Sequence, residues 1–454
     1  MQNRYENQII SNIEASIWPG DAYIYPRKFM YESMEIDFLE VWKNERKINI
    51  YIHIPFCVSK CAFCGFFALG MNQHKGKSMS SYIEKYTVAL VDEIKYFATI
   101  MKDVEVCSIY FGGGTPNVLK IEQISKILST IENHFFQSID NINVCFEAHP
   151  NLLHSSYISG LSENMVNRIS IGIQTFNEGE LKNAERFNNF KKIYDTVEIC
   201  HKYSMLFNVD LMIGLPNQDA KSIWFSIENT IKLEPQSITI YLLSIVKGTP
   251  LSRNDSIKAL SMKEIYLLLP KIFEYMNANN YIQQSNVSFI NKSFYNKNNS
   301  MYLKVGSVDP KIPTLGLGLG SRSFGSEIHY TTRYSSNQNE IISFVESYLE
   351  MNNKKLEYVG VRLSIDENKR RYVILNLADG GIDMLDYKNR FGSEILQDFQ
   401  EEFSALNNLN MIIIADNQIT LTTKGFVYSD VISAIFVSEN INRKNTERKI
   451  TSIL

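Results

Sequence analysis

Between residues 48 and 265 the chain alternates short apolar runs with longer amphipathic segments, and this alternation constrains the fold more than any other feature. The short runs are rich in β-branched and aromatic residues, as strands are: Asn49–Ile54, Ser108–Phe111, Asn143–Glu147, Arg168–Ile173, Phe207–Ile213 and Ser237–Leu242. Helical periodicity marks the segments between them: Ser81–Met101, Ile121–Phe135, Glu178–Asn188, Phe190–Tyr203 and Ala220–Leu233. Such alternation predicts a parallel sheet with right-handed crossovers, and the number of units predicts a partial (β/α)6 barrel.

Three cysteines, Cys57, Cys61 and Cys64, follow the first predicted strand. Thiolates at this spacing can hold three irons of a cubic 4Fe–4S cluster and leave the fourth iron open to a ligand. A structural zinc site needs four closed ligands, and no second cysteine or histidine pair follows at zinc-finger distance. We therefore predict a 4Fe–4S cluster.

The remaining cysteines occur singly in apolar runs that are typical of a core. They are Cys107, Cys145 and Cys200. A disulfide framework is disfavoured for this reason. Since no signal peptide is recognisable, we expect a reducing compartment and a cytoplasmic protein.

Further polar and glycine residues end or follow the predicted strands, where parallel barrels place their reactive groups. Gly112, Gly113 and Gly114 would let the backbone approach a ligand closely, although a tight turn with positive φ is the alternative explanation. Glu147 and Asp210 suit the hydroxyl or amino groups of a ligand, but either could cap a strand end.

The cysteine motif resembles that of radical S-adenosylmethionine (SAM) enzymes. Four further segments are similar to the branch that contains oxygen-independent coproporphyrinogen oxidase, a haem chaperone, anaerobic haem-degrading enzymes and class C radical methyltransferases. They are Ile-Tyr-Phe-Gly-Gly-Gly-Thr-Pro at 109–116, Phe-Glu-Ala-His-Pro at 146–150, Asn-Arg-Ile-Ser-Ile-Gly-Ile-Gln-Thr-Phe at 167–176 and Asp-Leu-Met-Ile-Gly-Leu-Pro at 210–216. The resemblance implies a radical SAM barrel whose cluster cleaves SAM reductively to a 5′-deoxyadenosyl radical.

The resemblance also implies a set of SAM contacts. It comprises Phe63 near the adenine, the run Gly112, Gly113, Gly114 and Thr115, and the side chains of Glu147, Gln174, Arg186 and Asp210. An arginine can hold a carboxylate through two parallel hydrogen bonds. Arg186, however, is predicted to lie on an exposed helix face, where a solvated charge is the alternative.

The length of 454 residues predicts two or three structural units. We expect an N-terminal extension over 1–47, the barrel over 48–265, a connecting segment beside the active site over 266–355 and a C-terminal α+β domain over 356–454. The last range contains predicted helices and a β-like pair and resembles the winged-helix-like domain of this branch. Its expected role is to close the barrel mouth over the substrate.

Two parts of the connecting segment carry separate expectations. Ser285–Lys304 is polar and asparagine-rich and is predicted to be a loop. Leu315–Gly325 has glycine at alternating positions, but it lacks the spaced third glycine and the later acidic residue of dinucleotide-binding loops.

The reaction is less constrained than the cofactor. Phe66 occupies the place of a fourth cysteine typical of the oxidases, and Asn298–Leu303 lacks the histidine and tryptophan of the chaperone's haem motif. The segment Tyr23–Tyr31 resembles the leader of class C methyltransferases. We therefore expect two SAM molecules, one cleaved and one donating a methyl or methylene carbon to an unsaturated or heteroaromatic carbon. Tetrapyrrole oxidation as in coproporphyrinogen III oxidase, anaerobic haem degradation and haem binding as in the chaperone remain the alternatives.

Composition limits the partners. A formal charge of −3 disfavours non-specific electrostatic binding of nucleic acid. The C-terminal segment is basic, with Arg443, Lys444, Arg448 and Lys449, and is expected to be solvated. No run of eighteen apolar residues occurs, so no membrane span is expected. The expected partners are a small-molecule substrate, either a tetrapyrrole or an aromatic natural product, and an electron donor such as flavodoxin or ferredoxin.

Overall fold

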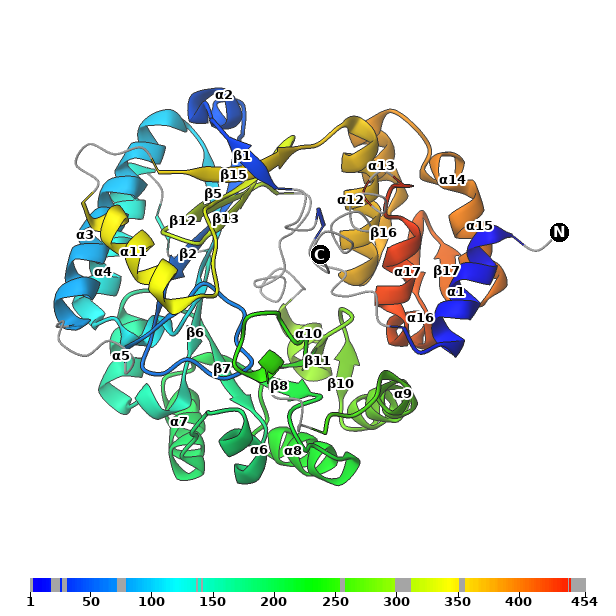
Figure 1. Ribbon diagram of the computed structural model, residues 1–454, viewed down its shortest axis with the longest axis horizontal. Helices are drawn as coiled ribbons and strands as arrows, with labels where there is room; N and C mark the ends of the chain where they lie inside the picture. Colours follow the sequence, from blue (N-terminus) through cyan, green and yellow to red (C-terminus); the bar gives the residue numbers. More distant parts are fainter. Residues whose placement is uncertain are drawn as a thin grey trace. The chain divides into compact units, whose positions relative to one another are not determined.

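The computed structural model describes residues 3–17, 25–26, 31–71, 79–135, 138–139, 142–253, 258–298, 312–350, 356–439 and 441 (Figure 1). The chain forms two compact units. The first, here called the barrel unit, contains Ser33–Ala259 and Ser293–Gly360; the second, the terminal unit, contains Met1–Glu32, Leu260–Lys292 and Val361–Leu454. This grouping joins segments that are distant in sequence, and the expected linear partition into four ranges stays a prediction.

Six consecutive parallel strands form the centre of the barrel unit, as predicted. They are β2 (Lys47–Ile54), β5 (Glu105–Gly113), β6 (Asn143–Ala148), β7 (Arg168–Gln174), β8 (Leu206–Ile213) and β9 (Ser237–Leu242). Each pairs with the next in parallel register, for example Tyr51 with Tyr110 and Cys145 with Arg168. The mixed α/β fold with a partial parallel barrel is therefore confirmed.

Helices lie outside these strands (Figure 1). They are α3 (Met79–Ile100), α4 (Ile121–His134), α5 (Ser155–Glu163), α6 (Glu178–Asn183), α7 (Phe190–Lys202) and α8 (Ala220–Lys232). The helix predicted over Glu178–Asn188 ends five residues early, because Glu185 adopts a φ of 51°, which a right-handed helix does not allow. The sequence pattern did not predict helix α5.

The two faces of the barrel strands differ in character. Residues on one face are apolar and almost fully buried, for example Ile50, Ile52 and Ile54 of β2. Those on the other face are aromatic or polar. They include Tyr51, His53, Tyr110, Glu147, Ser170, Asn208, Asp210 and Tyr241. The apolar face packs beneath the helices, so the second face forms the inner wall of the barrel.

Beyond β2 the sheet continues on its other side. β12 (Thr314–Leu317) runs parallel to β2, and β13 (Arg322–Phe324), β14 (Ile328–Thr332), β15 (Tyr358–Arg362) and β1 (Glu32–Met34) follow in that order. The helices α2 (Phe38–Trp42) and α11 (Gln338–Leu349) belong to this region. The predicted loop Ser285–Lys304 is wrong in part, because Ser288–Asn291 forms β11 and Lys292–Asn298 forms α10; residues 299–304 lie outside the described residues.

The terminal unit is an α+β structure. Its helices are α1 (Arg4–Glu14), α9 (Met262–Ala278), α12 (Ile365–Ala378), α13 (Met384–Phe391), α14 (Ile395–Asp398), α15 (Gln400–Asn408), α16 (Thr423–Val427) and α17 (Ser429–Ile435). Strand β10 (Tyr281–Gln283) pairs antiparallel with β11. A separate three-stranded antiparallel sheet has β18 (Gln418–Leu421) between β16 (Ile382–Asp383) and β17 (Ile412–Ala415). Helix α1 packs on α15 and α17, so the start of the expected extension belongs to this unit.

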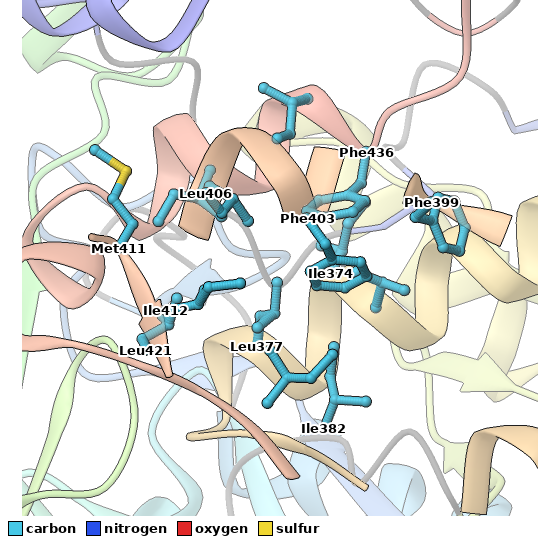
Figure 2. Close-up of a cluster of buried hydrophobic side chains, with 14 of the residues drawn as sticks. Ile374, Leu377, Ile382, Phe399, Phe403, Leu406, Met411, Ile412, Leu421 and Phe436 are labelled. Atoms are coloured by element: carbon cyan, nitrogen blue, oxygen red, sulfur yellow. The ribbon is translucent and has the colours of Figure 1, made fainter. Parts of the chain in front are cut away.

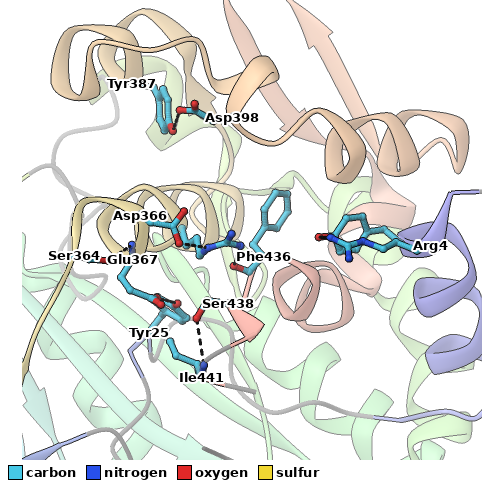
Figure 3. Close-up of polar contacts among 12 residues, drawn as sticks. Arg4, Tyr25, Ser364, Asp366, Glu367, Tyr387, Asp398, Phe436, Ser438 and Ile441 are labelled. Atoms are coloured by element: carbon cyan, nitrogen blue, oxygen red, sulfur yellow. Dashed lines mark hydrogen bonds and ion pairs between the residues drawn. The ribbon is translucent and has the colours of Figure 1, made fainter. Parts of the chain in front are cut away.

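An apolar cluster holds the terminal unit together. Ile374, Leu377, Phe403 and Leu406 are at most 2% exposed and converge from α12 and α15 (Figure 2). Polar contacts lie around this core (Figure 3): the hydroxyl of Tyr25 donates to Glu367, and that of Tyr387 donates to Asp398 at 2.6 Å. Burying apolar area of this kind is the main favourable contribution to folding.

No helix in the described part of the chain has the length and apolar character that crossing a membrane requires.

Candidate functional site

The cysteine loop follows β2 and β3 (Phe56–Cys57) and is fixed by three other loops. The N–H of Ala62 donates to the carbonyl of Ala184 at 3.0 Å, and the N–H of Leu251 donates to the carbonyl of Ala62 at 3.0 Å. The hydroxyl of Tyr334 donates to the carbonyl of Gly65 at 2.9 Å. The positions of the sulfurs are thus set by chain segments after β7, β9 and β14.

The three cysteines of this loop are free thiols, with Cys57 buried and Cys61 and Cys64 half-buried. Burial raises the pKa of Cys57 to about 12, while the side chain of Thr115 acts in the opposite direction. Burial also raises the pKa of Cys64, and the neighbouring Cys61 adds to the shift. The sulfurs lie close enough to influence one another, and metal binding is the process that would remove their protons.

The geometry of this triad differs from that of a site for one ion. Among the described residues no three His, Cys, Asp or Glu side chains are arranged to hold a single metal ion. A single zinc would need its sulfur ligands at about 2.3 Å from one point. A cubic cluster places each thiolate on a different iron, so three thiols of one loop fit the cluster better than the ion.

Arg186 lies beside the cysteine loop, and the predicted exposed helix face is wrong. It follows the end of α6 in a loop and is half-buried. Its Nη1 lies 3.5 Å from Sγ of Cys61, and its Nη2 donates to the carbonyl of Gly172. The guanidinium therefore places positive charge beside the triad.

Two buried polar atoms near this point have no hydrogen-bond partner, namely Oε1 of Gln174 and Nε of Arg186. Both side chains lie against Gly172, where an added Cβ would come within 3.0 Å of Gln174 Nε2 and 3.2 Å of Arg186 Nη2. Gln174 ends β7 with a φ of 71°, an uncommon conformation for a residue with a side chain. An unsatisfied donor and acceptor side by side fit a ligand that carries both kinds of group.

Glu147 and Asp210 lie on the inner wall. Glu147 accepts hydrogen bonds from the hydroxyl of Tyr110 at 2.8 Å and from the N–H of Gly113 at 3.3 Å. Asp210 accepts from Ser170 at 3.0 Å and from Asn208 at 2.7 Å. Asp210 is in the middle of β8, so the expectation that it ends or follows its strand is wrong.

Burial raises the pKa of both carboxyl groups, that of Glu147 to about 7 and that of Asp210 to about 6. The charge of Asp210 raises the pKa of Glu147 further, although they belong to β6 and β8. Burial raises the pKa of Tyr241 on β9, and the nearby charges of Asp210 and Glu147 raise it further. Side chains from non-adjacent strands therefore converge, and a cationic ligand would relieve the repulsion between the carboxylates.

The glycine run presses the end of β5 against the cysteine loop. Gly113 has a φ of 107°, and a Cβ there would come within 2.6 Å of the His53 ring. The N–H groups of Gly114 and Thr115 donate to the carbonyls of Ile54 and Phe56, both at 2.8 Å. The alternative explanation, a backbone conformation with positive φ, therefore applies at Gly113. A SAM contact by the Gly112–Gly114 backbone stays a prediction.

His53 and Lys60 are important in the site but were not predicted. His53 donates from Nε2 to the carbonyl of Phe67 at 2.8 Å, and burial lowers its pKa to about 4, so the ring is neutral. Lys60 is 9% exposed and donates to the carbonyls of Phe66 and Ser336. The only signal in the sequence is that both are polar residues within an otherwise apolar segment.

Alternating glycines in Leu315–Gly325 also have a packing role. Gly320, with a φ of 85°, would bring a Cβ within 2.6 Å of the Phe67 ring. Tyr86 donates to the carbonyl of His53 and accepts from the N–H of Leu319, both at 2.9 Å. This segment supports the cysteine loop from behind.

The remaining expected residues are placed as follows. Phe63 is half-buried within the cysteine loop, and its contact with adenine stays a prediction. Cys145 and Cys200 are buried as expected, but Cys107 is half-buried and not in the core. Residues 23–24 and 27–30 of the leader, 299–303 of the haem-motif position and the basic residues after 441 lie outside the described residues.

Comparison with known proteins agrees with this geometry. Residues 51–228 match the Radical SAM superfamily. The heme chaperone HemW of Buchnera aphidicola is 34% identical over 203 residues, which cover 45% of this chain and 52% of the relative, so the alignment spans about half of that protein. The HemW of Lactococcus lactis is 25% identical over 401 residues, covering 87% of this chain and 98% of the relative.

Two further relatives come from the oxidase side. The oxygen-independent coproporphyrinogen III oxidase of Helicobacter pylori is 24% identical over 413 residues and 86% of each chain. The solved structure of coproporphyrinogen III oxidase (HemN) from Escherichia coli has a TM-score of 0.74 at 21% identity, covering 91% of this chain and 96% of that one. At this identity the match shows the fold.

The fold and the cysteine loop define a Radical SAM domain over residues 51–228. Over most of its length the chain is similar to oxygen-independent coproporphyrinogen III oxidases and heme chaperones. The expected preference for methyl transfer is not supported, because the relatives that align over most of this chain are coproporphyrinogen oxidases and haem chaperones. These relatives fit tetrapyrrole oxidation and haem binding better.

Proposed function

We propose that this protein binds a 4Fe–4S cluster through Cys57, Cys61 and Cys64, binds SAM beside it, and oxidises a tetrapyrrole. The cluster would supply the electron that splits SAM and releases a 5′-deoxyadenosyl radical. The observation that carries the proposal is the pair of unsatisfied polar groups on Gln174 and Arg186, with Arg186 beside Cys61. The carboxyl groups of Glu147 and Asp210, which influence one another on the inner wall, add to it.

Each of these groups has a role that its surroundings favour. The cation of Arg186 and the acceptor of Gln174 suit the carboxylate and amino groups of SAM. Glu147 and Asp210 suit the ribose hydroxyls, and the positive charge of SAM would favour their ionised forms. The aromatic wall of Tyr51 and Tyr110, whose rings stack at 5.9 Å, limits water access to the reacting region.

A tetrapyrrole substrate is supported by relatives of two kinds. The names of the aligned proteins refer to coproporphyrinogen and to heme, which share the tetrapyrrole skeleton. Phe66, where the oxidases typically have a further cysteine, is the departure that bears on the reaction. We expect a substrate of this class with a reaction that does not require a thiol at that place.

The test uses the full chain, reconstituted with iron and sulfide without oxygen. With dithionite and SAM it should release 5′-deoxyadenosine, and coproporphyrinogen III should increase the yield and appear as a decarboxylated product. The Cys61→Ala variant is the control. An intact cluster that gives no 5′-deoxyadenosine would refute the proposal.

Haem binding is the second candidate, and the alignment that covers 98% of a haem chaperone favours it. Titration of the full chain with haem should then give a saturable Soret band, together with little 5′-deoxyadenosine. A band that grows without saturation, as for free haem, would exclude this candidate.

A second SAM molecule and methyl transfer are tested in the same mixtures. Two equivalents of bound SAM with S-adenosylhomocysteine as a product would be required for them. We propose a reducing, cytoplasmic setting, because cysteines that bind a cluster must stay reduced.

A further inference from the structure

Apolar side chains are exposed on the cysteine loop and on the segment that lies against it. Phe66 is 64% exposed, and Ile245 and Val246, which follow β9, are 54% and 38% exposed. Val246 lies against the loop itself, since a Cβ on Gly65 would come within 2.7 Å of it. A group of exposed apolar residues indicates a contact surface more than scattered single ones do.

Positive charge accompanies these residues. Lys247 and Arg253 are exposed, and Nη2 of Arg253 donates to the carbonyl of Gly248 at 3.3 Å, which keeps its cation beside this segment. We call Phe66, Ile245, Val246, Lys247 and Arg253 the loop rim.

The charge of the loop rim is opposite to that of the chain. Residues 56–68 and 243–253 contain Lys60, Lys247 and Arg253 and no aspartate or glutamate, whereas the whole chain has a formal charge of −3. Glu185, exposed on the loop that bonds Ala62, contributes a nearby negative charge. The local balance is nevertheless basic, and it would attract an acidic surface.

The proposed reaction needs one electron for each SAM that is cleaved, and that electron must arrive from outside the chain. The rim covers the loop that holds Cys61 and Cys64, the two half-buried cysteines of the triad. A carrier seated on the rim would therefore have its redox centre near the cysteines.

We infer that the loop rim is the docking surface for a small acidic one-electron carrier of the flavodoxin or ferredoxin type. The inference rests on the proposed function, because it names the donor of the electron which that function consumes. An apolar centre with basic neighbours matches a brief encounter, and electron-transfer complexes commonly bury less than about 1,200 Å². The carrier is oxidised by one electron, and the acceptor at the cysteines is reduced by one.

The test reverses charge on the rim and compares two reductants. Lys247→Glu/Arg253→Glu is prepared as the full reconstituted chain beside a control of equal net charge, Lys126→Glu/Lys232→Glu. The control residues are exposed on α4 and at the end of α8. An acidic flavodoxin, reduced beforehand, is the physiological-type donor, and dithionite is the small reductant that needs no docking.

We expect the rim variant to slow cluster reduction by flavodoxin about tenfold at low salt, with a smaller defect as salt rises. Reduction by dithionite should be unchanged, and the control variant should behave as the unmodified chain. Direct binding of oxidised flavodoxin, measured by calorimetry, should weaken in parallel. Ile245→Ser should weaken binding without altering its salt dependence.

Three outcomes would overturn the inference. One is an equal loss with both reductants in the double variant and also in Lys247→Glu alone, which keeps the hydrogen bond between Arg253 and Gly248. Another is an equal loss in the control variant, and the third is no loss with flavodoxin. Failure of the proposed function looks different: the cluster is reduced normally by both donors, but no 5′-deoxyadenosine forms.

Discussion

The interior of the terminal unit and the inner wall of the barrel unit differ in the kind of side chain that they contain. The first is a cluster of aliphatic and aromatic side chains such as Phe403 and Leu406. The second has carboxyl groups with raised pKa values and polar atoms without partners, such as Gln174 Oε1. An interior that maximises stability would not keep such groups, so the difference indicates that the barrel wall is completed by ligands.

The largest expected effect concerns the barrel unit, where we propose that the cysteine loop binds the cluster. Cys61→Ala removes one of three thiolates, so the purified variant should retain little iron and form no detectable 5′-deoxyadenosine, while its unfolding midpoint changes little. Cys107→Ala, at the other end of β5, should keep both iron and activity. Equal loss in the two variants would break the distinction between ligand cysteines and the others.

The next effect is on the stability side. Phe403 is 2% exposed, and truncation to alanine leaves a cavity, so Phe403→Ala should lower the free energy of unfolding by about 3–5 kcal/mol. Phe225→Ala, at an exposed site on α8, should change it by about 0.5 kcal/mol or less. Denaturant titration of the ligand-free chain measures both. Similar losses of unfolding free energy in the two variants would show that the apolar cluster around Phe403 is not the core of the terminal unit.

A smaller effect concerns Glu147. If this carboxylate binds SAM, Glu147→Gln should raise the Kd for SAM about ten- to a hundredfold, as expected for losing a hydrogen bond to a charged group worth about 1.5–3 kcal/mol. The stability of the ligand-free protein should not fall, because the variant removes a buried acid. Glu105→Gln, at the exposed start of β5, is the control. Unchanged SAM affinity would remove Glu147 from the binding set.

The last expected effect is a dependence of stability on pH. Burial raises the pKa of Glu147 to about 7 from 4.5 and that of Asp210 to about 6 from 3.8. The folded chain therefore holds these protons more tightly than the unfolded chain, and this stabilisation is lost as pH rises through the folded pKa values. The ligand-free protein should be less stable at pH 8 than at pH 5 on account of these groups. The slope should be shallower in Glu147→Gln and with SAM bound; identical slopes would contradict the assignment.

The parts of this protein that were predictable are those with a local cause. Each barrel strand alternates a residue for the apolar face with one for the inner wall, and that period is visible in short windows, as in Tyr-Ile-His-Ile at 51–54. The cysteine loop was predictable because its chemistry lies within one short segment.

The rest depends on contacts between distant segments. Arg186 was expected on a helix face, and only the early end of α6 turns it toward Cys61. Glycine is required at position 320 because the ring of Phe67 packs against it, and this contact cannot be read from the local sequence. The terminal unit combines three separate stretches of chain, and no local sequence pattern predicts which stretches pack together.

The supports of the cysteine loop have a consequence for biosynthesis. Tyr334 and Ser336, which bond Gly65 and Lys60, are made some 270 residues after the cysteines, and Gln338 donates to the carbonyl of Ala68. During translation the loop therefore leaves the ribosome long before its supports exist. The loop can therefore take its final shape only after residues 334–338 have been made, and iron that reaches the chain earlier would meet a thiol segment without these supports.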